Sequence, residues 1–269
     1  MFDTGAHTSS ASKEKIVVCQ LGQVPYEPTW QLQKALQATL ITAKRDKPPR
    51  RIPHVMLAVQ HPPVYTLGKS GNEQNLLVSE EFLVSQGASF VRIDRGGDIT
   101  YHGPGQLVGY PILDLDRINP DIHLYLRNLE EAGIRSCRDY GIEAGRVKGK
   151  TGVWIDVEDE RTARKICAMG LRCSRWVSMH GFAFNVDTDL KFFDNIVPCG
   201  IANREVTTLT KETGRTIDVE DLLPIWLSHF ASIFDVELQV LNYEASLEFL
   251  NDYLETSLEP FELVREPAE

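Results

Sequence analysis

The hydrophobic positions along this chain follow two spacings, one typical of helices and one typical of strands. In four segments the apolar side chains recur every three or four residues, which predicts helices at residues 26–45, 122–140, 218–234 and 245–254. Elsewhere they alternate with polar residues or form short apolar runs. These runs predict strands at residues 15–20, 55–60, 64–67, 89–93, 107–115, 153–157, 165–173, 179–186 and 236–240.

Helices and strands are interleaved, and the middle of the chain is rich in strands with short connections. This order favours an α+β fold, with a mixed central β-sheet flanked by helices, over a strictly alternating parallel sheet. Ser79 and Gly87 are typical of the start and stop of a short helix, and Gly141 is typical of a helix end. No internal repeat or long linker divides the chain, so a single core is expected.

The segment from Arg95 to Gln106 has a composition that packing alone does not require. Within twelve residues it holds four glycines and a proline, together with Asp98, Tyr101 and His102. Glycine permits tight backbone turns but loses more chain entropy on folding than any other residue. The segment therefore suggests backbone N–H groups and side chains that converge on a ligand. The alternative is a plain glycine-rich turn between two strands, which leaves Arg95, Tyr101 and His102 unexplained.

Charge is distributed unevenly along the chain, whose net charge is −10. Residues 216–269 hold thirteen Asp and Glu against Arg265 alone, so nucleic acid is not an expected partner. Residues 135–175 hold ten Arg and Lys against six acids and could steer an acidic partner. A merely solvated face is the alternative for both regions. No apolar run reaches the roughly 18 residues that cross a membrane, and residues 1–14 are polar and predict a disordered tail.

The five cysteines are widely scattered and include no Cys-x-x-Cys pair. Neither a disulfide framework nor a zinc site fits this pattern, which favours a reducing cytoplasm. Four of them lie in apolar runs and are predicted to be small core residues, whereas Cys199 stands at a turn in the sequence Val-Pro-Cys-Gly-Ile. His102, His123 and His180 have no partner three or four residues further along the chain that would suggest a metal site.

Two segments come close to familiar nucleotide-binding motifs, but neither has the required spacing. Gly109 is one residue too far from Gly103 and Gly105 for a dinucleotide-binding turn, and no capped helix begins there. The segment from Gly145 to Thr151 is one residue short of a phosphate loop, and strand-like sequence follows it where a helix is needed. No cofactor is expected.

Lys165, Cys199 and the histidines are the candidates for chemistry. For Lys165 the plain alternative is an exposed strand-edge lysine, and for Cys199 it is a buried thiol that fills a turn. If they meet, an ammonium about 4 Å from the sulfur offers roughly 4 kcal/mol at an effective dielectric of 20. Lowering the pKa of a thiol from ~8.5 by about 1.5 units needs only ~2 kcal/mol. The glycine after Cys199 would let a backbone N–H approach a carbonyl oxygen, as an oxyanion hole requires.

Six segments in order resemble the lipoate-pathway octanoyltransferases. They are HPPVYTLG at 61–68, RGGDITYHGPGQLVGYPI at 95–112, TGVW at 151–154, KICAMG at 165–170, MHGFAFN at 179–185 and IVPCGI at 196–201. The match runs from about residue 15 to 240. The tail before Lys15 has no counterpart, and residues 241–269 form an acidic, helical C-terminal extension that we expect to pack on the same domain.

The resemblance implies the biotin/lipoate ligase catalytic domain, a class II synthetase-like fold. It implies that Cys199 accepts the acyl group as a thioester and that Lys165 lowers the pKa of Cys199 and moves protons. It also implies a set of residues in contact with the acyl group. These are Arg95, Gly96, Gly97, Asp98, Ile99, Thr100, Tyr101, His102, Ala168, Met169, Gly170, Gly181, Phe182 and Ala183.

The implied donor is octanoyl-acyl carrier protein. The implied acceptors are the lipoyl domains of 2-oxoacid dehydrogenases or the glycine-cleavage carrier protein, and neither metal nor ATP takes part. The basic stretch from Arg146 to Arg175 would dock the acidic carrier, and family members are usually monomers. One rival is a lipoate or biotin ligase, which activates a free acid with ATP and lacks the cysteine of the Pro-Cys-Gly turn. Another is a non-catalytic scaffold that binds lipoyl domains or acyl carriers.

Overall fold

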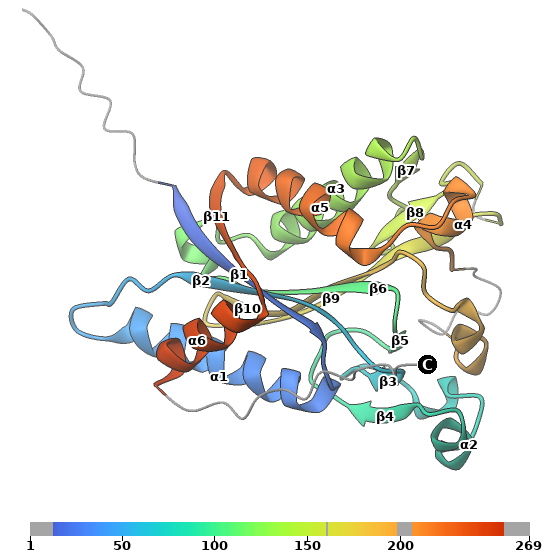
Figure 1. Cartoon of the computed structure of the whole chain (residues 1–269), viewed down its shortest axis with the longest axis horizontal. Helices are drawn as coiled ribbons and strands as arrows, with labels where there is room; N and C mark the ends of the chain where they lie inside the picture. Colours follow the sequence, from blue (N-terminus) through green and yellow to red (C-terminus); the bar gives the residue numbers. More distant parts are fainter. Residues whose placement is uncertain (1–12, 160, 198–205, 256–269) are drawn as a thin grey trace, which may run out of the picture.

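Two β-sheets and two layers of helices make up this computed structural model, which describes residues 13–159, 161–197 and 206–255 (Figure 1). The larger sheet has eight strands in the order β11-β1-β2-β6-β10-β9-β8-β7, and the smaller has three in the order β4-β3-β5. The strands are β1 Glu14–Gln23, β2 His54–Gln60, β3 Val64–Leu67, β4 Ser89–Arg92, β5 Ile99–His102, β6 Gln106–Ile112, β7 Ala144–Gly145, β8 Val153–Ile155, β9 Arg164–Ser174, β10 Val177–Asn185 and β11 Val236–Leu241.

The helices are α1 Tyr26–Arg45, α2 Glu80–Ser85, α3 Ile122–Asp139, α4 Leu209–Thr213, α5 Val219–Phe234 and α6 Tyr243–Leu254. Short 3₁₀ turns lie at Glu73–Asn75, Leu115–Arg117 and Leu190–Asn195. The large sheet is mixed, because β1 runs parallel to β2 and β11 while β6, β10, β9 and β8 pair antiparallel. The predicted mixed sheet flanked by helices is therefore confirmed.

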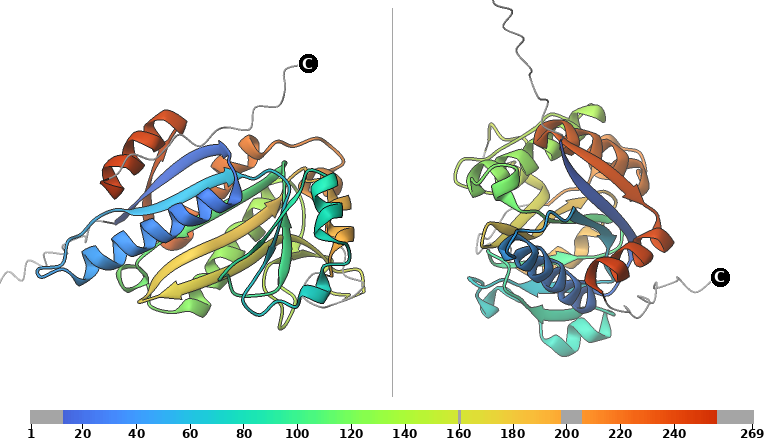
Figure 2. Two further views of the ribbon diagram at one scale, coloured as in Figure 1. Left: turned by 90° about the horizontal axis from the view of Figure 1, so that it is seen from below. Right: turned by 90° about the vertical axis from the view of Figure 1, so that its left-hand side faces the viewer.

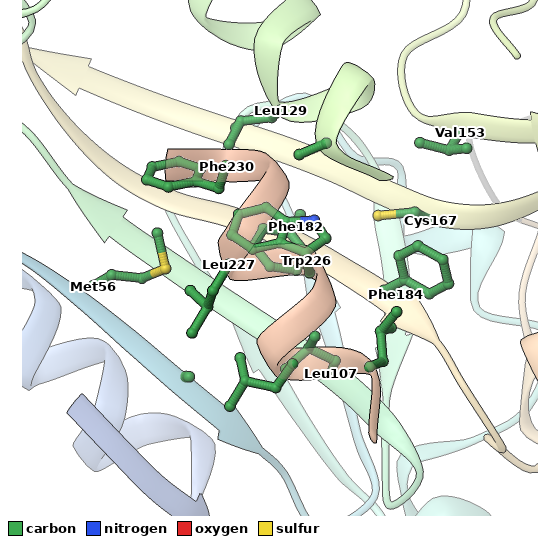
Figure 3. Close-up of a cluster of buried hydrophobic side chains, with 14 of the residues drawn as sticks. Met56, Leu107, Leu129, Val153, Cys167, Phe182, Phe184, Trp226, Leu227 and Phe230 are labelled. Atoms are coloured by element: carbon green, nitrogen blue, oxygen red, sulfur yellow. The ribbon is translucent and has the colours of Figure 1, made fainter. Parts of the chain in front are cut away.

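Helices cover both faces of the large sheet (Figures 1 and 2). On one face α3 and α5 enclose the larger core, where Phe182 stacks on Trp226 at 4.1 Å between ring centroids (Figure 3). On the other face α1 lies across β6 and β10, and α6 contacts β1, β11 and α1. No helix of the described residues is long and apolar enough to cross a membrane.

Most element positions predicted from spacing are confirmed, the bounds of α1 and β3 among them. Ser79 caps α2 by accepting a hydrogen bond from the Phe82 N–H. Gly87 and Gly141 follow helix ends with φ of 69° and 78°, a region in which glycine has no Cβ clash. The helical spacing and the turn glycines act locally, and for that reason the sequence alone indicates them.

Three expectations were wrong or incomplete. The three-stranded sheet is separate from the central one, and its strand β5 lies inside the segment that a plain turn would occupy. Strand β6 ends at Ile112 rather than at 115, because Leu115–Arg117 forms a 3₁₀ turn. Cys173 is exposed near the β9–β10 turn, whereas Cys19, Cys137 and Cys167 are buried as predicted.

Candidate active site

Small residues on neighbouring strands leave a trough on the α1 face of the large sheet. Ala168 of β9 is paired with Ala183 of β10, and Gly170 is paired with Gly181. Because side chains alternate between the faces of a strand, all four share one face, opposite the core that holds Phe182. At Gly181 the close neighbour is backbone, since an added Cβ would lie 2.1 Å from the Gly109 carbonyl oxygen.

The loop that begins at Arg95 closes over this trough. The Arg95 guanidinium donates hydrogen bonds to the carbonyl oxygens of Asp98 (2.8 Å) and Thr66 (3.2 Å). The Gly96 N–H donates to the Leu171 carbonyl oxygen on β9 at 3.0 Å. Gly97 has a φ of 102°, which other residues rarely adopt. The arginine and its glycines therefore hold the loop against the β9–β10 hairpin.

The Asp98 carboxylate orders a neighbouring turn. It accepts hydrogen bonds from the backbone N–H groups of Ile99 (2.8 Å) and Asn72 (3.1 Å) and from the Asn75 side chain (2.5 Å). A carboxylate that accepts from this many donors fixes the loop rather than the substrate. Asp98 therefore serves the shape of the site.

A cavity of about 100 Å³ lies between this loop, β5 and the β9–β10 hairpin. It brings together residues from all three segments predicted to contact the acyl group. On its wall are Arg95, Gly97, Asp98, Ile99, Thr100, His102, Ala168, Met169, Gly170, Gly181, Phe182 and Ala183. Lys165 also lines it.

Two predicted contact residues, Gly96 and Tyr101, are absent from the cavity wall as the described residues define it. The Tyr101 ring stacks on Phe192, with ring centroids 4.8 Å apart, and so belongs to the core beneath the small sheet. The wall also contains residues that sequence reasoning did not assign to it, namely Tyr26, Gln106, Tyr110, His180, Asn185, Phe193 and Val206. Several stand inside or beside the six family-like segments, which was the available signal.

Lys165 is held by its neighbours on β8. It pairs across the strands with Trp154, and its Nζ lies 4.6 Å from the centroid of that indole ring. Such a contact favours the charged ammonium. The Lys165 carbonyl accepts a hydrogen bond from the Thr207 N–H at 3.0 Å. Cys199 lies outside the described residues, so its meeting with Lys165 stays a prediction.

A buried ion cluster fixes the segment that carries Trp154. The Glu130 carboxylate on α3 accepts from the Gly152 N–H (2.9 Å) and from the Arg146 guanidinium (2.9 Å), and it forms an ion pair with the Arg127 guanidinium at 2.9 Å. Gly152 has a φ of 115°, and an added Cβ would lie 2.5 Å from the Cys167 carbonyl oxygen and 3.5 Å from Lys165 Cε. The Thr-Gly-Val-Trp segment is therefore pressed against the lysine.

Three buried histidines surround the cavity, and burial keeps each of them neutral. It lowers the pKa of His61 and of His180 to about 4 and the pKa of His102 to about 3. His61 has a partner on both ring nitrogens, and His102 and His180 each have one on one nitrogen. His102 Nδ1 lies 2.8 Å from Gln106 Oε1, and His180 Nε2 lies 3.0 Å from Asp94 Oδ1. Among the described residues no cluster of three His, Cys, Asp or Glu side chains could hold a metal ion.

Acid is expected to destabilise this protein through these histidines and through His54, whose pKa burial lowers to about 3. Between these native pKa values and the unfolded value near ~6.5, the unfolded state binds more protons, so stability rises with pH. Stability is then complete above about pH 6.5 and is lost as the pH falls toward 4 and below. Each histidine adds a slope of up to about 1.4 kcal/mol per pH unit, measurable by urea titrations at a series of pH values.

A single substitution isolates the contribution of one buried histidine. His54→Leu should flatten the slope by one histidine. A slope equally steep in wild type and His54→Leu would contradict the neutral, buried state of His54.

Comparison with known proteins identifies the family. A model of the lipoyl protein ligase A/B catalytic domain matches residues 25–231. An octanoyltransferase of Christiangramia forsetii is 50% identical over 231 residues, which cover 84% of this chain and 98% of the relative. An octanoyltransferase of Flavobacterium johnsoniae is 49% identical over 230 residues, covering 84% and 99%.

A solved structure shows the same fold at much lower identity. The bi-partite lipoate protein ligase from Thermoplasma acidophilum has a TM-score of 0.62 and 15% identity, and the match covers 96% of this chain and 100% of that chain. The identity to the octanoyltransferases is about three times higher and extends over nearly their whole length. This chain therefore belongs to the octanoyltransferases within the lipoyl protein ligase A/B catalytic-domain family.

Proposed function

We propose that this protein transfers an octanoyl group from octanoyl-acyl carrier protein to the lysine of a lipoyl domain, through a thioester on Cys199. The observation that carries the proposal is the cavity, which gathers Lys165 and the trough of Ala168 and Ala183 under the Arg95 loop. Burying seven carbons of the acyl chain there could supply about 5 kcal/mol, at ~0.8 kcal/mol per methylene. The family membership supports the same reaction.

In the first step the Cys199 thiolate attacks the thioester carbonyl of the donor. The bond from that carbonyl carbon to the carrier's sulfur breaks, and the pantetheine thiol leaves with a proton from the Lys165 ammonium. One thioester replaces another, so this exchange is nearly balanced in free energy. The ammonium that the Trp154 ring holds in place is the group that stabilises the thiolate before attack.

In the second step an amine of the lipoyl domain attacks the octanoyl-enzyme thioester. A lysine amine has a pKa near ~10.4 and must lose a proton to react. That first proton goes to solvent. As the amine nitrogen bonds to the carbonyl carbon and the C–S bond breaks, the neutral Lys165 left by the first step takes the second proton from this nitrogen, and Cys199 departs as thiolate. The product is an amide, so the step runs downhill and needs neither ATP nor a metal ion. The acceptor is the lipoyl domain of a 2-oxoacid dehydrogenase or the glycine-cleavage carrier.

Fewer basic residues are available to dock the acidic carrier than the charge count of this stretch suggests. Several arginines of the stretch from 146 to 175 are already engaged with carboxylates: Arg146 with Glu130, Arg164 with Glu212 and Arg172 with Asp94. Paired guanidiniums attract a distant acidic surface less strongly than isolated ones. Lys148, at an exposed turn, is the cation that we expect to contribute most directly.

The test is a mass spectrum of the intact protein after brief exposure to octanoyl-acyl carrier protein without acceptor. We expect one octanoyl adduct, located on Cys199, that disappears when a lipoyl domain is added and the domain gains the same mass. Cys199→Ala should form no adduct. Modification of the lipoyl domain that requires ATP and survives in Cys199→Ala would instead establish a ligase, and binding without turnover would establish a scaffold.

A further inference from the structure

The cavity has a direction along the sheet. The Asn185 side-chain amide donates to the Thr207 carbonyl oxygen (3.1 Å), and the Thr207 N–H donates to the Lys165 carbonyl oxygen (3.0 Å). Asn185 is in turn paired with Gln106 at the start of β6. The pair Gln106–Asn185 therefore marks the end of the cavity at which Lys165 lies.

The other end of the cavity lies farther along β6. Tyr110 is four residues beyond Gln106, on the same face of the strand, which places it about 13 Å away at ~3.3 Å per residue. Tyr110 and Tyr26 both line the cavity. The Tyr26 ring stacks on His102, with centroids 5.7 Å apart, and lies 5.1 Å from the His61 ring.

Hydrogen bonds hold this aromatic group in place. A backbone carbonyl can only accept, so the contact of 2.7 Å between His61 Nδ1 and the Val24 oxygen puts the ring proton on Nδ1. His61 Nε2 then accepts from the Tyr110 hydroxyl at 2.8 Å. The Tyr26 and Tyr110 hydroxyls interact as well. Tyr110 thus donates a hydrogen bond to His61, which in turn donates one to the main chain. These two bonds fix the position of the Tyr110 ring, which forms a rigid surface.

Arg95 closes the trough at the same end. An added Cβ on Gly170 would lie 2.7 Å from Arg95 Cδ and 3.0 Å from its Cγ, so the aliphatic part of this arginine covers Gly170. One pair of residues closer to Lys165, at Ala168 and Ala183, only methyl groups occupy the trough. The open part of the trough therefore runs from Lys165 to the level of Gly170 and Gly181.

We propose that Tyr26, Tyr110 and the aliphatic part of Arg95 form an end wall of the acyl pocket that limits the acyl group to about eight carbons. This inference rests on the proposed function, which puts the thioester at the Lys165 end. Subtracting about 4 Å for van der Waals contact from the 13 Å leaves about 9 Å. An extended eight-carbon chain measures about 9 Å, at roughly 1.3 Å per bond. Two further carbons would press against rings that cannot yield.

The experiment measures the rate of acyl-adduct formation with acyl-carrier donors of six to fourteen carbons. In the wild type kcat/KM should rise to eight carbons and fall steeply beyond eight. Tyr26→Ala opens the wall, and the ratio of kcat/KM for decanoyl to octanoyl donor should increase about 15-fold, the ratio that two newly buried methylenes give.

Two controls make the result specific. Tyr26→Phe keeps the ring and should keep the wild-type chain-length preference. Tyr125→Ala removes an equally buried tyrosine that contacts Phe234 in the core on the opposite face of the sheet, and should also keep it. An unchanged ratio in a folded Tyr26→Ala that still forms the octanoyl adduct would overturn the end wall.

The rates of the wild type with donors of different chain length test the end wall even if Tyr26→Ala does not fold. Dodecanoyl transfer as fast as octanoyl transfer in the wild type would overturn the proposal. Failure of the wild type to form an adduct with any donor has a different meaning, because it refutes the proposed function itself and removes the thioester from the Lys165 end.

Discussion

Replacing Lys165 by methionine is expected to slow formation of the octanoyl-enzyme by roughly 10²–10⁴-fold, the range that proton transfer by a positioned side chain supplies. Methionine keeps most of the hydrocarbon that contacts the Trp154 ring but removes the ammonium beside it. In the proposed mechanism, the Cys199 thiol then loses the charge that favours its thiolate. Rapid-quench mass spectrometry of the adduct measures the rate.

Alkylation by iodoacetamide across a range of pH tests the cause of that slowing. Cys19, Cys137 and Cys167 are buried and should stay silent, but Cys173 is exposed and would react, so the experiment uses a Cys173→Ser background. Lys165→Met should move the alkylation midpoint of Cys199 to higher pH. Lys15→Met, at an exposed position of β1 outside the basic stretch, should leave both rate and midpoint at wild-type values. An unaltered midpoint in Lys165→Met would contradict the assigned role of the lysine.

Local patterns gave the correct elements because their causes are local. The bounds of α1 follow from apolar spacing, and the cap at Ser79 follows from a side-chain oxygen three residues before the Phe82 N–H. The twelve cavity residues on the predicted contact segments could be predicted from the family resemblance, because segments that match a motif are expected to have the same local structure as the family. Spacing alone would not have brought Arg95, Ala168 and Gly181 to one wall.

Features that depend on pairing between distant strands were not accessible. Nothing in the sequence near Ile99 shows that β5 pairs with β3 in a separate sheet, because that choice is made by Leu67 and Val64 thirty or more positions away. Tyr101 illustrates the consequence. Its motif predicts substrate contact, but period-two alternation along β5 turns its ring toward Phe192 while Thr100 and His102 meet the cavity.

The end of the cavity was equally hidden. Tyr26 begins a helix that reads as an ordinary amphipathic one, and its ring reaches His102 only because α1 crosses β6 and β10. The same holds for Glu130, which in the sequence is one of two adjacent acids on a helix. The fold puts Glu130 into the interior and leaves Glu131 half-buried, and only coordinates distinguish the two.

Glu130→Ala is expected to lower the free energy of unfolding by about 3–5 kcal/mol, the loss typical when one partner of a buried ion pair is removed. The substitution leaves the Arg127 and Arg146 guanidiniums without their shared carboxylate oxygen and the Gly152 N–H without its acceptor. Urea titration at neutral pH measures the change. Glu131→Ala is the matched control, because that carboxylate pairs with Arg135 and Arg146 near solvent and should contribute less than about 1 kcal/mol.

Glu130→Ala also tests whether the ion cluster helps to orient Lys165 for the reaction. Gly152 is two residues before Trp154. Loss of the hydrogen bond from the Gly152 N–H should therefore make the position of the indole that faces Lys165 less fixed. At a temperature where Glu130→Ala is fully folded, adduct formation should therefore still be slower than in wild type, and Glu131→Ala should show no such deficit. Equal rates in the folded variants would mean that Lys165 keeps its position without Glu130. The ion cluster would then stabilise the fold and have no part in orienting the lysine.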